Sequence, residues 1–268
     1  MTQLDKFGFL SKEVDNSISQ TRSKYKDYFA LSEEMNKFGY SLLFEIFNTN
    51  CNESSTNNDA KFFILKLLFT RVLNTFDGIV VLLERGMQTQ ATMLLRCMIE
   101  TMYVIEALNN DEDFIKDYLK HDEAQKLIMK IKGYEADIIK KSNNYNQSEY
   151  DKLKNAYNKK RNNLIKTGKL VEKANLTDFH KMTYNLLSQA THPTIFGLEE
   201  EFLNKTDNGK IEIYVGPSKK NIERTFETSF ITIIMVSETV TQMFDINHQE
   251  EINIFNKRIN GFYDLKEN

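Results

Sequence analysis

Proline, cysteine and tryptophan are scarce in this chain of 268 residues, which contains two Pro, two Cys and no Trp. Glycine is also infrequent, at ten residues. All-β and α/β folds need many turns, and turns depend on Gly and Pro, so this composition favours long helices. With 41% hydrophobic and 27% charged residues, the overall composition is that of a globular protein.

The two cysteines, Cys51 and Cys97, occur in different surroundings, a polar loop and an apolar helix. A disulfide framework is not expected, and a reducing compartment is the simpler interpretation. The N-terminal sequence also lacks the apolar core of a signal peptide.

The most apolar stretch, residues 62–83, is interrupted by Lys66, Arg71 and Asp77. Charges at this density argue against a membrane span. The sequence therefore predicts a cytoplasmic protein with no membrane association.

Charge is distributed unevenly along the chain. Residues 130–173 contain twelve Lys or Arg and five Asp or Glu, a net charge of +7 within a chain of net charge −3. Such a segment could bind RNA phosphates, with Lys159, Lys160 and Arg161 as predicted substrate-binding residues. The alternative is a solvated helix with scattered charges.

Hydrophobic periodicity and capping residues predict a succession of helices. They are expected at about residues 17–47, 59–85, 88–109, 111–141, 149–170, 175–192, 218–244 and 249–265. Residues 201–205 and 210–215 flank Asn208-Gly209, with Ile211, Ile213 and Val215 alternating, which predicts a small β-hairpin.

We therefore predict an all-α fold, a multi-helix bundle with long helices. A single domain over residues 1–268 is expected, with its core at about 17–110 and 175–265. A charged helical hairpin at about 111–172 projects from this core, and one small β-hairpin is inserted.

Two polar patterns lie within apolar helical stretches. The first is Arg96-Cys-Met-Ile-Glu100, whose charged residues are four apart and share one helix face. A charge on an apolar helix is costly unless it is paired, so the pair is either a buried clamp that fixes helix register or a site. In a site, Arg96 would hold an anion such as phosphate and Glu100 would orient it.

The second pattern places His180, Tyr184, Ser188 and His192 on one face, four residues apart, before Pro193. His192 is the main candidate for a general base, because the dipole at a helix C-terminus favours its charged form. Ser188 and Tyr184 would position the substrate and His180 would bind it. A histidine that caps its own helix is the alternative.

Several common site patterns are absent. Gly-x-Gly-x-x-Gly, the Walker loop, His-Glu-x-x-His, Cys-x-x-Cys and Gly-x-Ser-x-Gly do not occur. The four histidines are dispersed, so neither a metal site nor a bound cofactor is expected.

These motifs resemble the bacterial domain-of-unknown-function family 5677. The resemblance lies in Arg85-Gly86, Ala91-x-x-Leu-Leu-Arg96-x-x-x-Glu100 and Tyr184-x-x-Leu-Ser188-x-x-x-His192-Pro193, over about residues 59–196. It implies an all-α fold and a place in mobile or phage-defence gene neighbourhoods. A more distant, fold-level analogy is the HEPN class of helical proteins, although no Arg here is followed by His at the HEPN spacing of four to six residues.

Three functional hypotheses remain open. The first is a non-catalytic interaction or sensor module of a defence or toxin system, with a protein partner. The second is a metal-independent HEPN-like endoribonuclease that uses Arg96 and His192 on RNA. The third is a small-molecule enzyme or nucleotide sensor. The large apolar face of the last helix also predicts a homodimer.

Overall fold

The computed structural model describes residues 8–10, 14–49, 57–136, 145–191, 195–205, 211–213, 216–218 and 220–267. The longer helices of this part are α3 (Lys26–Asn48), α4 (Asn57–Glu84), α5 (Gln88–Asn110), α6 (Phe114–Glu135), α12 (Ile222–Met243) and α13 (Gln249–Glu267). The shorter ones are α2 (Val14–Lys24), α8 (Gln147–Lys160), α9 (Thr167–Lys173), α10 (Thr177–Thr191) and α11 (Ile195–Phe202).

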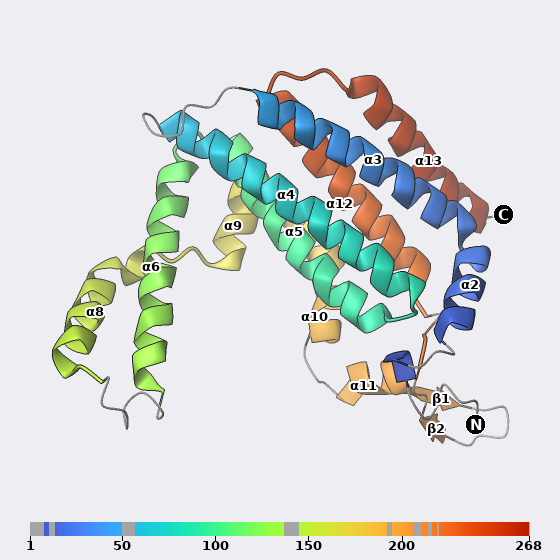
Figure 1. Cartoon of the computed structure of the whole chain (residues 1–268), viewed down its shortest axis with the longest axis horizontal. Coiled ribbons are helices and arrows are strands. Elements are labelled where there is room, and N and C mark those ends of the chain that lie inside the picture. The colour runs from blue at the N-terminus through green and yellow to red at the C-terminus, as the bar shows by residue number, and fades with distance from the viewer. Residues whose placement is uncertain are drawn as a thin grey trace.

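Helix α5 forms the centre of the bundle. It packs against α4 and α12 along its length and also contacts α6, α9 and α10 (Figure 1). From Thr101 to Ile105 every residue of α5 is buried, as expected of a helix that is covered on all sides. Helix α3 lies across α4 and α12, and α13 packs on α12.

Helices α4 and α5 are joined by a tight turn at Gly86. Its φ of 71° is a left-handed conformation that favours glycine. The Gly86 carbonyl accepts a hydrogen bond from Ser218 N–H at 2.9 Å, and Pro217 lies against the turn. This turn therefore also holds the segment that leads into α12.

The first predicted helix, at about residues 17–47, is divided in the structure. It breaks at Tyr25 into α2 and α3. Because the Tyr25 ring and the following Tyr28 and Phe29 are all buried, tertiary packing sets this break where the sequence pattern is continuous.

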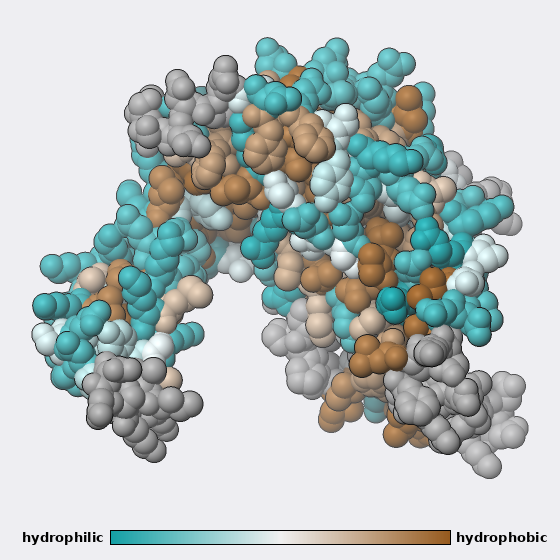
Figure 2. Space-filling model, viewed as in Figure 1, coloured by the Kyte–Doolittle hydropathy of each residue, from teal (hydrophilic) through white to brown (hydrophobic). Residues whose placement is uncertain are grey.

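Helices α6 and α8 form the projecting arm of the molecule, and mostly hydrophilic side chains cover it (Figures 1 and 2). Helix α8 has no buried residue. Residues 167–172 were assigned to this hairpin from the sequence, but they lie in α9, which returns to α5; Val171 and the following Ala174 are buried there.

The predicted fold class requires one correction, at the β-hairpin insertion. Helix α11 continues through Glu201 to Phe202, because Leu198 and the three glutamates 199–201 are good helix formers. Among the residues of this region that the structure describes, the extended ones are the three-residue segments β1 (Leu203–Lys205) and β2 (Ile211–Ile213), which pair antiparallel. Ile211 and Ile213 are exposed, so these segments add nothing to the core, and the fold is an all-α bundle. The expected turn residues Asn208 and Gly209 lie outside the described residues.

The apolar face of α13 packs on its own bundle. Phe262 stacks on Tyr28 of α3, with ring centroids 4.2 Å apart, and Ile252 and Ile259 are buried. The exposed apolar face inferred for this helix, on which the homodimer was predicted, is therefore covered by α3 and α12. Within the described ranges, no helix combines the length and the apolar character that a membrane crossing requires.

Candidate functional site

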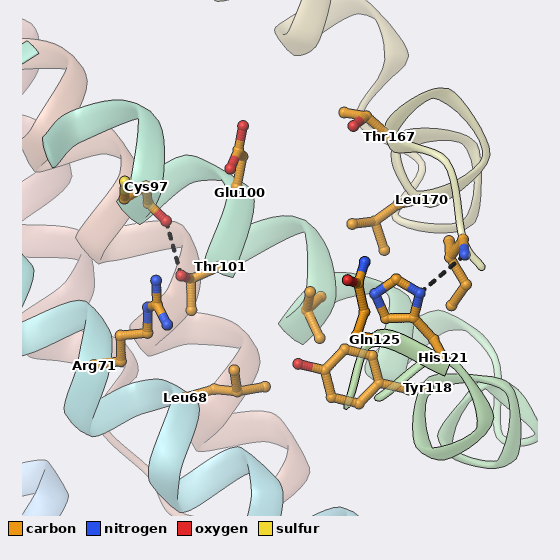
Figure 3. A pocket seen from close by; sticks show the side chains of 12 residues that line it. Leu68, Arg71, Cys97, Glu100, Thr101, Tyr118, His121, Gln125, Thr167 and Leu170 are labelled. Atoms are coloured by element: carbon orange, nitrogen blue, oxygen red, sulfur yellow. Dashed lines mark hydrogen bonds between the residues drawn. The ribbon is translucent and has the colours of Figure 1, made fainter. Parts of the chain in front are cut away.

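A cleft of about 480 Å³ opens between the bundle and the base of the α6–α8 arm (Figure 3). Its residues come from four helices and from the segment before α9. They are Leu68 and Arg71 of α4, Cys97, Glu100, Thr101 and Val104 of α5, Tyr118, His121 and Gln125 of α6, and Ile165, Thr167 and Leu170. This volume lies in the range of small-molecule sites in proteins.

Arg71 is one of three charged residues in the apolar part of α4. Lys66 is buried and donates to the Thr49 carbonyl at 2.9 Å. Asp77 accepts hydrogen bonds from Tyr40, at 2.9 Å, and from Asn36, and burial raises its pKa. The Arg71 guanidinium forms no hydrogen bond or ion pair with any residue that the structure describes, and it lines the cleft. Its five donors are therefore available to a ligand.

His121 is fixed in one tautomer on the opposite wall. Its Nδ1 accepts a hydrogen bond from Ile165 N–H at 3.0 Å, so the neutral ring carries its proton on Nε2. Burial lowers its pKa below the ordinary 6.5, while Asp122 acts in the opposite direction. The centroids of the Tyr118 ring and the His121 imidazole are 6.3 Å apart, and the angle between the two ring planes is 23°.

Acidification is expected to destabilise the fold through His121. Because its folded pKa is lowered, the unfolded state binds more protons below about pH 6.5, so stability falls as the pH decreases through this window. The His121→Gln variant keeps an acceptor for Ile165 N–H but does not titrate. Urea unfolding between about pH 5 and pH 7.5 should give a steeper pH dependence for the wild type than for this variant. Parallel curves would contradict the assignment.

A second, narrow recess adjoins the cleft and contains the two charged residues of the first sequence motif. Arg96 Nε donates to Glu100 Oε1 at 3.0 Å, and the Tyr103 hydroxyl lies 3.1 Å from His180 Nδ1. Glu100 and Thr167 line both the recess and the cleft. The recess measures about 10 Å³, which is room for no more than one water. The larger cleft is therefore the site that can take a ligand.

The titratable groups in this recess are either kept uncharged by burial or paired with an opposite charge. Burial raises the pKa of Tyr103 to about 12, with the Glu100 carboxylate adding to the effect and Thr183 opposing it. Burial and the nearby Arg96 lower the pKa of His180, against the effect of Glu100. At neutral pH His180 and Tyr103 are thus an uncharged pair that links α10 to α5.

Comparison with known families gives a match that covers more than half of the chain. The model of a family of unknown function, DUF5677, matches residues 62–211. The chain belongs to the DUF5677 family. The matched segment contains every residue of the cleft and of the recess. No curated protein and no solved structure matches this chain.

The residues predicted as a site from the two polar patterns are brought together in part. Arg96, Glu100 and His180 line the recess, and Ser188 is half-buried on α10. His192, the candidate general base, lies outside the described residues, as does the side chain of Tyr184.

The Arg96–Glu100 pair is not the buried clamp considered from the sequence. The two side chains are 25% and 48% exposed, because this face of α5 borders the cleft. An exposed helical pair at this spacing contributes about 0.3–0.5 kcal/mol to stability.

The predicted substrate-binding residues of the basic segment lie on the arm. Lys159 and Lys160 end α8, and Arg161 begins the short 3₁₀ turn after it. Lys160 is paired with Glu123 of α6 at 2.6 Å. None of the three lines the cleft.

Sequence reasoning missed the cleft residues Arg71, Tyr118, His121 and Gln125. They are spread over two helices and form no short motif. The sequence contained one signal, because Arg71 is a charge within the apolar part of α4. The same is true of Lys66 and Asp77, however, and only the structure shows that those two have internal hydrogen-bond partners and that Arg71 lines the cleft.

Proposed function

We propose that this protein is a cytoplasmic, non-catalytic sensor module of a bacterial defence or toxin system, and that its cleft binds a small anionic ligand. The observation that carries this proposal is Arg71. Of the three charges in the apolar part of α4, it alone has no hydrogen bond or ion pair with a described residue, and it lines a cleft large enough for a small molecule. The defence context is an expectation from the family resemblance.

The position of the cleft supports a sensing role. Its walls belong both to the bundle, through α4 and α5, and to the arm, through Tyr118, His121 and Gln125 of α6. The arm contacts the bundle mainly at its base, where Phe114 and Ile115 are buried. A ligand that bridges the two parts would favour one arm position over others. The exposed, charged arm would then be the surface that a protein partner reads.

A thermal shift assay with small anions tests the ligand proposal. A ligand at a free concentration of about 100 times its Kd adds about 2.7 kcal/mol to the free energy of unfolding. This raises Tm by roughly 5–10 °C in a chain of this size. Arg71→Gln should abolish the shift, and Arg224→Gln, at an exposed position on α12, should keep it. If no phosphate, carboxylate or nucleotide of the panel raises the Tm of the wild type or of Arg224→Gln, the proposal is contradicted.

A second candidate function is the metal-independent ribonuclease, and the observation behind it is that Arg96 and His180 lie together beside the cleft. In this hypothesis Arg96 binds the scissile phosphate, Glu100 holds Arg96, and His192 acts as the base. Cleavage of tRNA and mRNA in EDTA, lost in both Arg96→Ala and His192→Ala, would support it. Equal RNA stability with and without the wild-type protein would leave the sensor module as the function.

A homodimer is part of the proposal but would need a surface other than α13. Exposed aromatic side chains at the adjoining ends of α3 and α4 are Phe44, Phe47 and Phe63. Light scattering of the wild type and of Phe44→Ser would show whether the protein dimerises through them.

A further inference from the structure

The chemistry of the cleft is asymmetric along its length. A guanidinium, Arg71, lies on the α4 side, and two aromatic rings, Tyr118 and His121, lie on the α6 side (Figure 3). The rest of the lining is mixed, with the aliphatic residues Leu68 and Val104 beside polar ones such as Thr101. We propose that the cleft binds a mononucleotide, with its phosphate on Arg71 and its base against Tyr118 and His121. This inference rests on the proposed function, since it names the class of the anionic ligand.

The aromatic wall provides a surface for a planar heterocycle. Phe114, Tyr118 and His121 follow one face of α6, and the Tyr118 and His121 rings lie within 23° of parallel. Both rings line the cleft, and their planes are nearly parallel. Stacking on such a surface suits any base, because every base has a π-face.

Polar groups beside this wall can bind the edge of a base. Because His121 Nδ1 is occupied by Ile165 N–H, Nε2–H remains as a donor, and Figure 3 shows this side of the ring directed toward Gln125. The Gln125 amide offers both donors and an acceptor. A simple hydrocarbon ring would leave these groups unused, whereas a base has complementary nitrogen and oxygen atoms.

The opposite end suits a phosphate group. Arg71 can form two parallel hydrogen bonds to phosphate oxygens, a geometry that lysine cannot offer. The acidic residue of the cleft, Glu100, is held by Arg96 at 3.0 Å and lies apart from Arg71 in Figure 3. A cleft of about 480 Å³ holds a mononucleotide.

Calorimetric titration of the full chain tests the inference with four probes: AMP, adenosine, ribose 5-phosphate and a single-stranded RNA. AMP should bind at least about tenfold more tightly than adenosine or ribose 5-phosphate, because only AMP uses both ends of the cleft. Arg71→Gln should weaken AMP about tenfold or more and leave adenosine unchanged. Tyr118→Leu should weaken AMP and adenosine and leave ribose 5-phosphate unchanged. Arg224→Gln serves as the control, and all variants should unfold within a few degrees of the wild type.

Three results would overturn the inference. If ribose 5-phosphate binds as tightly as AMP, the aromatic wall makes no contact, and the anion-sensor function stands without the nucleotide. If RNA binds and no mononucleotide does, the ligand class is wrong and the ribonuclease hypothesis gains support. If neither these probes nor the wider anion panel binds, the proposed function fails with the inference.

Discussion

Replacement of Gly86 by alanine is expected to lower the free energy of unfolding by about 2–4 kcal/mol. Gly86 has a φ of 71°, which strains any residue with a Cβ atom. An added Cβ would also lie 2.6 Å from Pro217 Cβ and 2.8 Å from Pro217 Cα. Pro217 Cα is a backbone atom. It cannot move away without breaking the hydrogen bond between Ser218 N–H and the Gly86 carbonyl. Urea unfolding followed by circular dichroism measures the loss.

Gly261 is the matched control for this prediction. It lies within α13, and an added Cβ meets no atom within 4 Å. Alanine there should raise stability by about 0.5–1 kcal/mol, because glycine is a poor helix former. If Gly86→Ala proved as stable as the wild type, the turn between α4 and α5 would differ from the one described.

Removal of the Tyr28 hydroxyl is expected to cost about 1.5–3 kcal/mol. This hydroxyl donates to Glu227 Oε1 at 2.8 Å, and both side chains are buried. Tyr28→Phe keeps the stack on Phe262 but leaves the Glu227 oxygen without this donor. A chemical denaturation midpoint below that of the wild type, with an unchanged m-value, would be the expected result.

Tyr150→Phe provides the comparison on the arm. Its hydroxyl donates to Glu135 at 2.7 Å, a similar bond, but on an exposed surface. Water replaces the lost partner there, so the change should stay within about 0.5 kcal/mol. Equal losses for the two variants would mean that the Tyr28–Glu227 bond is not shielded from water.

The sequence was sufficient to predict most of the long helices and their order. Low Gly and Pro content, periodicity and residues such as Gly86 located α4, α5 and α12 to within a few residues. The break at Tyr25 was not predictable in this way, because it lies among side chains that the bundle buries and local propensity does not record burial. Helix α11 was missed for another reason: the Asn208-Gly209 turn signal was given more weight than the helix propensity of Leu198 and the glutamates after it.

The candidate site was predictable only where its residues lie within one helix. Spacing alone placed Arg96 and Glu100 on one face, and the structure shows them paired. Their exposure, and the meeting of α4 with α6 that creates the cleft, depend on helix packing. His121 gave no signal in the sequence, because its role comes from a backbone N–H 44 residues away.

The composition of the cleft has a consequence for the order of assembly. Helices α6 and α8 are neighbours in the chain and can pair early, by local contacts. The cleft instead needs Leu68 of α4 and Leu170 of α9 in the same lining, so it is complete only after α9 has docked on α5. A chain in which the arm has formed but α9 has not docked would lack part of one wall. Binding competence would therefore be among the last properties that the folding chain acquires.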